Sequence, residues 1–98
     1  MIRVKRILSE DELCGFEIKG HANSEEYGKD LVCAAVSSII TGGFNALVKE
    51  EIDKITLNEG YAKVIIKNHG NQSKMVLNVI DIQLQTIEER YPKYINIK

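Results

Sequence analysis

The spacing of apolar residues changes repeatedly along this chain of 98 residues, and that alternation restricts the folds open to it. Short segments in which apolar and polar residues alternate, the pattern of half-buried strands, occupy residues 1–7, 13–21, 52–57 and 61–68. Residues 30–50 and 73–90 repeat apolar residues every three or four positions instead, as amphipathic helices do. With a short last strand at 94–97, the order predicts an α+β fold, ββαββα(β), whose antiparallel or mixed sheet packs with two helices.

Length and composition predict one domain over residues 1–98, with 44% hydrophobic residues to form a core. The net charge of −1, from 13 basic and 14 acidic residues, argues against a protein that grips phosphate backbones, so no direct nucleic-acid binding is expected. No apolar run reaches the roughly 18 residues of a membrane span, and no secretory leader is evident. Two cysteines without a spacing motif favour free thiols in a reducing cytoplasm.

The two cysteines have different surroundings in the sequence. Cys14 is in phase with Phe16 and Ile18 on one strand face, which predicts a buried core thiol. Cys33 falls in the first turn of the predicted helix, where free amides and the helix dipole favour a thiolate. The alternative for Cys33 is a structural role in the small apolar face that follows it.

His21 ends the second predicted strand, between Gly20 and Ala22, and eleven residues separate it from Cys33. A loop of that length can bring the imidazole to the thiol, as nucleophilic cysteine catalysis requires. The alternative is an exposed histidine at a strand end. Neither a zinc-binding cluster nor a phosphate loop is present in the sequence, so we expect no metal and no cofactor.

Three further features surround this pair. Asp30 is either the cap of the helix N-terminus or a carboxylate that orients His21. Ser37, one turn beyond Cys33 on the same helical face, either supports the site or bonds back to a carbonyl. Residues 22–29, with Tyr27 and Gly28, are polar and predict a loop that could act as a lid.

These residues resemble the signature of the ribosomal-processing cysteine protease (Prp) family. The matching positions are Gly20-His21-Ala22, Tyr27-Gly28, Asp30, Val32-Cys33-Ala34-Ala35 and Ser37, and the stretch 84–89 is similar as well. The resemblance implies that Cys33 is the nucleophile and His21 the catalytic histidine, with Asp30 and Ser37 supporting the site. It also implies a homodimer and a mobile segment between the histidine and the cysteine that orders on substrate.

The substrate implied by the resemblance is the N-terminal extension of the large-subunit ribosomal protein numbered twenty-seven, cleaved between an aromatic and a small residue. Amides at the helix N-terminus, including that of Cys33, would then stabilise the oxyanion. Two alternatives remain at this point. One is a non-catalytic partner of the ribosome, and the other is a thiol hydrolase acting on a small molecule.

Overall fold

The computed structural model describes the backbone of residues 1–20 and 27–98, and the side chains of residues 1–20 and 31–98. The strands are β1 (Ile2–Ser9), β2 (Glu12–Lys19), β3 (Ile52–Asn58), β4 (Tyr61–Ile66) and β5 (Ile95–Ile97). The helices are α1 (Tyr27–Asn45) and α2 (Asn71–Arg90), with a single 3-10 turn, η1, at Lys49–Glu51. This order confirms the α+β fold predicted from the sequence, including the short last strand.

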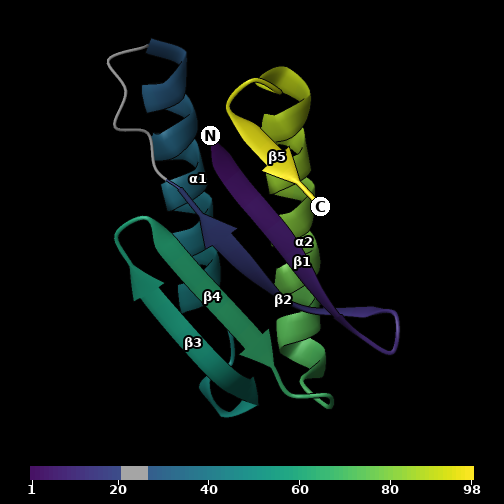
Figure 1. Cartoon of the computed structure of the whole chain (residues 1–98). Helices are drawn as coiled ribbons and strands as arrows, with labels where there is room; N and C mark the ends of the chain where they lie inside the picture. Colours follow the sequence, from purple (N-terminus) through teal and green to yellow (C-terminus); the bar gives the residue numbers. More distant parts are fainter. Residues whose placement is uncertain (21–26) are drawn as a thin grey trace.

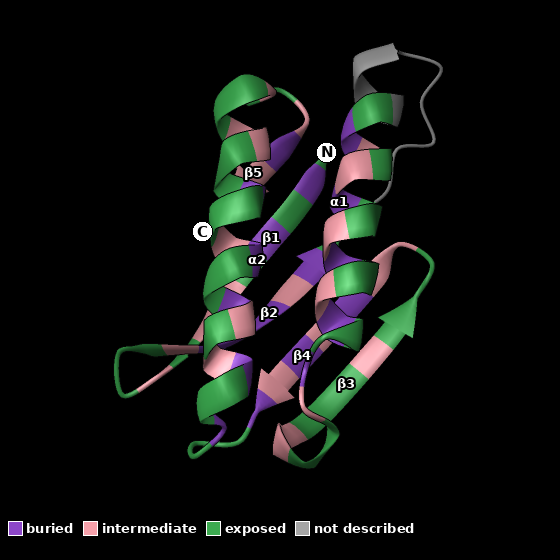
Figure 2. Cartoon of the chain, turned by 180° about the vertical axis from the view of Figure 1, so that it is seen from behind, coloured by how far each residue is buried: buried purple, intermediate pink, exposed green. Residues whose placement is uncertain are grey.

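The five strands form one mixed sheet in the order β3-β4-β2-β1-β5. All neighbouring strands are antiparallel except β1 and β5, which run parallel. Both helices lie on the same side of this sheet, behind the strands in Figure 1 and in front of them in Figure 2. Within residues 1–20 and 27–98, no element covers the other face of the sheet.

The core lies between the helices and the covered face of the sheet. Alternate strand residues point into it, among them Val4, Phe16, Ile18 and Val64. Helix α1 contributes a stripe repeated every four residues, and α2 contributes a second stripe; their buried members are Val32, Val36, Ile40, Phe44, Leu77, Ile80 and Leu84. Cys14 is buried in this core as its strand phase predicts.

The glycine pair in α1 allows the two helices to approach closely. A Cβ atom added at Gly43 would lie 2.6 Å from the side chain of Ile80 on α2, whereas one added at Gly42 would meet nothing within 4 Å. Gly43 is thus required by helix packing, and the helix continues through both glycines without interruption. Within the described residues, neither helix is long and apolar enough to cross a membrane.

Helix α1 is displaced toward the N-terminus relative to the sequence prediction. It begins at Tyr27 rather than near residue 30, and it ends at Asn45 rather than near Glu50. The loop predicted for residues 22–29 is therefore wrong from Tyr27 onward. Gly28, the second residue of the helix, costs at most about 1 kcal/mol relative to alanine, and the buried stripe of the helix outweighs that cost.

Candidate active site

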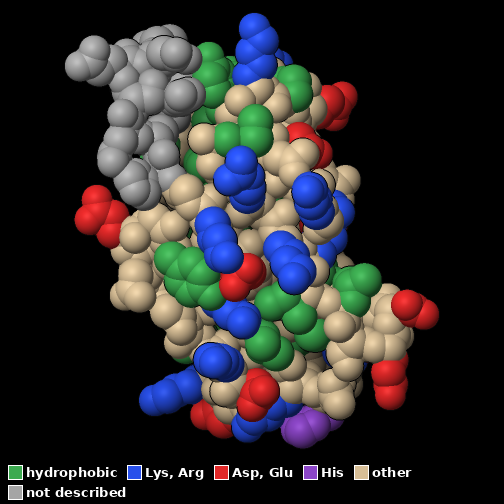
Figure 3. Space-filling model, in the orientation of Figure 1, with side chains coloured by type: hydrophobic (Ala, Val, Ile, Leu, Met, Phe, Trp, Pro, Cys, Tyr) green, Lys and Arg blue, Asp and Glu red, His purple; other side chains and the backbone are tan. Residues whose placement is uncertain are grey.

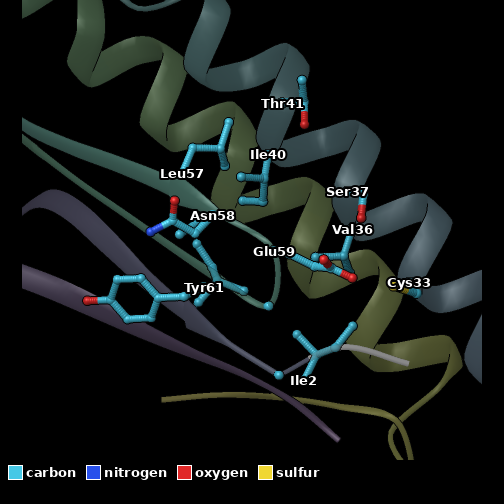
Figure 4. A pocket seen from close by; sticks show the side chains of 14 residues that line it. Ile2, Cys33, Val36, Ser37, Ile40, Thr41, Leu57, Asn58, Glu59 and Tyr61 are labelled. Atoms are coloured by element: carbon cyan, nitrogen blue, oxygen red, sulfur yellow. The ribbon is translucent and has the colours of Figure 1, made fainter. Parts of the chain in front are cut away.

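A cleft of about 420 Å³ lies between α1 and the strands, next to the β3–β4 turn (Figure 4). One wall is a single face of α1, formed by residues three or four positions apart: Cys33, Val36, Ser37, Ile40 and Thr41. The prediction that Cys33 and Ser37 share a helical face is confirmed, because both side chains line this cleft. Val36 and Ile40 are buried beside them, so the wall has an apolar floor and a polar edge.

The opposite wall comes from the covered face of the sheet and from the β3–β4 hairpin. Its apolar part consists of Ile2, Ile18, Leu57 and Ala62, and its polar part consists of Asn58, Glu59, Gly60 and Tyr61. Leu57 is 51% exposed, so much of its side chain is available to a molecule bound in the cleft. Among the described side chains that line it, the cleft has an apolar interior and a rim with one carboxylate, that of Glu59.

Gly20 closes one end of the cleft where β2 finishes. Its backbone N–H donates a hydrogen bond to the carbonyl of Gly60 in the β3–β4 turn, at 3.0 Å. Its φ of +101° lies in the region that favours glycine, and an added Cβ would lie 2.5 Å from the carbonyl oxygen of Met1. Geometry and space therefore both require glycine at this position.

His21 and Ala22 directly follow Gly20, and both lie outside the described residues. The contact between the His21 imidazole and the thiol of Cys33 therefore stays a prediction. The structure does bring Gly20, Cys33 and Ser37 to the same cleft, although the first is separated from the other two by more than ten residues of chain.

Cys33 is half-buried and is the seventh residue of α1, so its predicted position in the first turn is wrong. The first four amides of a helix lack an acceptor within it, and the influence of the dipole fades beyond the first turn. The amide of Cys33 therefore belongs to the hydrogen-bonded interior of the helix. The expectation that this amide stabilises an oxyanion is wrong for the same reason.

Asp30 is the fourth residue of α1, which removes the expectation that it caps the helix. A cap residue lies just outside the helical geometry, and this position lies within it. The side chains of Asp30, Tyr27 and Gly28 are not part of the described set, so the orienting role of Asp30 and the lid role of Tyr27 and Gly28 stay predictions.

The other cysteine is far less accessible to chemistry. Burial raises the pKa of the Cys14 thiol, since the charged thiolate is poorly solvated in the core. A small enclosed space near Cys14 has a volume of about 90 Å³, much less than that of the cleft at Cys33. Among the described side chains, no three histidine, cysteine, aspartate or glutamate residues group so as to hold a metal ion.

Tyr61 is a cleft residue that the sequence did not indicate. Its hydroxyl donates a hydrogen bond of 2.8 Å to Glu17 Oε2 on the neighbouring strand β2. This bond lowers the pKa of Glu17 and raises that of Tyr61, so the phenol stays protonated at neutral pH. The alternation of residues 61–68 predicts the strand but carries no signal that its first residue lies at the edge of the cleft.

Comparison with known proteins identifies a family for this chain. Residues 1–96 match the model of a family described as Cysteine protease Prp. A ribosomal processing cysteine protease Prp from Mycoplasma genitalium is 37% identical over 81 residues, which span 81% of both chains. These matches confirm the resemblance found in the sequence.

Two crystal structures of a ribosomal processing protease Prp from S. aureus share the fold. One is in complex with a substrate peptide and has a TM-score of 0.87 at 26% identity. The other is in complex with a covalently linked product peptide and has a TM-score of 0.84 at 30% identity. Each similarity covers 100% of the present chain and 98% of the other.

The difference in burial between the two cysteines predicts a difference in thiol reactivity. We expect iodoacetamide to modify Cys33 in the folded protein much faster than Cys14, because Cys33 is half-buried beside the larger cleft whereas Cys14 is buried. Mass spectrometry of peptides from briefly treated protein measures both rates. After unfolding in urea the two rates should converge, and equal rates in the folded state would contradict the assignment.

Proposed function

The chain belongs to the cysteine protease Prp family, and on that premise we propose that it removes the N-terminal extension of the large-subunit ribosomal protein numbered twenty-seven. It is a cysteine protease, and we assign Cys33 as its nucleophile and His21 as its general base. One observation carries the assignment: Cys33 and Gly20, the residue to which His21 is bonded, line the same cleft.

In the proposed reaction, His21 takes the thiol proton and Cys33 Sγ bonds to the carbonyl carbon of the scissile peptide. The tetrahedral adduct collapses, the C–N bond breaks, and His21 returns the proton to the leaving amine. Water, deprotonated by His21, then attacks the thioester carbon, the C–S bond breaks, and the carboxylic acid product leaves as the proton on His21 returns to the pair formed with Cys33. Asp30, if its carboxylate reaches His21, would hold the imidazole in the tautomer that this cycle requires.

Donors for the oxyanion must come from groups other than the amide of Cys33. We assign this task to the hydroxyl of Ser37, which lines the cleft one helical turn from Cys33. In Figure 4 the Ser37 side chain lies one turn along α1 from Cys33. A donor on a helix that the core anchors to the sheet is preorganised for this role.

The lining of the cleft suits the substrate proposed. Ile18, Ile40 and Leu57 provide an apolar interior for an aromatic side chain next to the scissile bond. Glu59 places a carboxylate at the rim, where it would attract a basic segment such as a ribosomal protein carries. The S. aureus relative with a substrate peptide supports a peptide as the occupant of this cleft.

We further propose that Ala22, Tyr27 and Gly28 belong to a gate over the cleft, because the segment between His21 and Cys33 leads from one of its walls to the other. Closure of such a gate would hold the substrate peptide in place over Cys33.

The reaction requires neither metal nor cofactor in this scheme. Since its substrate joins ribosomes, we place the protein in the cytoplasm.

A homodimer is also proposed, with the outer face of α2 as the contact. Met75, Val79 and Ile82 lie on consecutive turns and are 65%, 47% and 63% exposed. The only charged residues of α2 before Glu88 are Lys74 and Asp81, and both are ion-paired, to Glu12 and Arg6. An uncharged apolar face of this kind complements its own copy across a two-fold axis without like-charge repulsion.

Cleavage of an extended peptide with an aromatic–small junction tests the catalytic pair. We expect Cys33→Ala and His21→Ala each to lower kcat/KM by about three orders of magnitude or more, since each removes an obligatory participant. Cys14→Ala serves as the matched control and should retain cleavage, with only a loss of stability. Cleavage at the normal rate in either site variant would sink the mechanism.

Two residues of β3 test the specificity role of the cleft. Leu57 and Ile55 point to the same side of the strand and are 51% and 46% exposed, but only Leu57 lines the cleft. We expect Leu57→Ala to raise KM about tenfold, equivalent to about 1.4 kcal/mol of lost apolar contact, with kcat nearly unchanged. Ile55→Ala should leave both constants as they are; equal effects would argue that the substrate binds elsewhere.

The proposed dimer is tested by a charge placed in the centre of its contact. We expect the wild-type chain to sediment as a dimer at micromolar concentration and Ile82→Lys to sediment as a monomer, because a lysine there would be desolvated without a partner. Asn45→Lys adds the same charge at the exposed end of α1 and should remain dimeric. A dimer unaffected by Ile82→Lys would exclude this face.

A further inference from the structure

The uncovered face of the sheet is strongly basic although the chain as a whole carries a net charge of −1. Strand residues that alternate with the core positions point to this face, and the register aligns them in rows across the sheet. One row runs Asn96, Arg3, Lys19, Tyr61 and Asn58, and the next runs Lys5, Glu17, Lys63 and Thr56.

Six cations border or occupy this face: Arg3, Lys5, Lys19, Lys54, Lys63 and Lys98. Among the paired positions of the described strands, Glu17 is the single acidic residue facing the same way. Figure 3 shows lysine and arginine side chains gathered over β1, β2 and β4 on this side of the molecule. Most acidic residues lie elsewhere, for instance at the β1–β2 turn, where Glu10, Asp11 and Glu12 are exposed.

Glu17 offsets only a small part of this charge. It accepts the hydroxyl hydrogen bond of Tyr61 and lies 3.6 Å from Lys19 Nζ, so one carboxylate is already shared among its neighbours. A groove of about 210 Å³ runs beside it, lined by Arg3, Lys5, Lys19 and Lys98 together with Asn96. The groove therefore presents cations and a neutral amide, with no compensating acid beyond Glu17.

We propose that this open face binds the phosphate backbone of RNA. Adjacent strands place cations about 5 Å apart, and alternate residues along a strand place them about 7 Å apart, so a polyanion can meet several at once. The two isoleucines that face this way, Ile7 and Ile65, are half-buried, so cations rather than apolar side chains protrude from the described rows of this face. The net charge of the whole chain does not reveal this face, because the basic residues gather on it while most acidic residues lie elsewhere.

Binding at this face is independent of the proposed cleavage chemistry and compatible with it. The cleft lies on the helix-covered side of the sheet, so RNA on the open face would leave the cleft accessible. A protease that acts on a ribosomal protein could in this way engage the RNA that its substrate accompanies. The result would be a higher local concentration of substrate at the cleft.

Fluorescence anisotropy of a labelled single-stranded RNA with the full chain tests the proposal. We expect binding whose log K falls linearly with log salt, with a slope of up to about −4 if all six cations engage. The variant Lys5→Gln/Lys63→Gln removes two of them away from Gly20 and the cleft. It should weaken binding and reduce the slope by about 1.4, while cleavage of a free peptide stays unchanged.

Lys49→Gln/Lys93→Gln is the matched control, because it removes the same charge from exposed positions outside the sheet face. It should bind RNA like the wild type. Absence of binding at low salt, or an equal loss in both double variants, would overturn the proposal. Binding to vesicles containing phosphatidylserine but not to RNA would overturn it too, in favour of a membrane surface.

Discussion

The close approach of three backbone segments at Gly20 is the constraint on which the candidate site depends. Here the end of β2 is held between the carbonyl of Met1 and the carbonyl of Gly60, the latter through a hydrogen bond of 3.0 Å. No side chain fits in this gap, and the positive φ turns the chain away from the sheet. The junction thereby fixes both the point at which the chain leaves β2 toward His21 and the position of the hairpin that forms one wall of the cleft.

Helix α1 contributes the opposite wall because its accessible positions lie directly beside its buried ones around the helix. Val32, Val36, Ile40 and Phe44 anchor the helix on the sheet at intervals of four residues. Cys33 and Ser37 lie one position further round, so the same packing that buries the stripe turns them toward the cleft. A change in this packing would rotate the thiol relative to the hairpin. The reactivity of Cys33 therefore depends on core contacts that never touch the substrate.

The sequence predicted the parts of this arrangement that local patterns encode. Strand alternation placed Cys14 in the core, and helical spacing placed Cys33 and Ser37 on one face. It failed at the start of α1, since a polar segment with one glycine resembles a loop while tertiary packing extends the helix through it. The contribution of Leu57, Asn58 and Tyr61 was out of reach, because strand order and hairpin position come from long-range pairing rather than from local pattern.

The two faces of the sheet divide the molecule into parts of different chemistry, and the register keeps them apart. On β2, Ile18 borders the cleft while its neighbours Glu17 and Lys19 point to the open basic face. A shift of one residue in pairing would exchange these sets, burying charges and exposing the core. The penalty for such a shift protects the register more strongly than any single contact does. The cleft and the cationic surface are consequently fixed relative to each other by the same hydrophobic alternation that folds the chain.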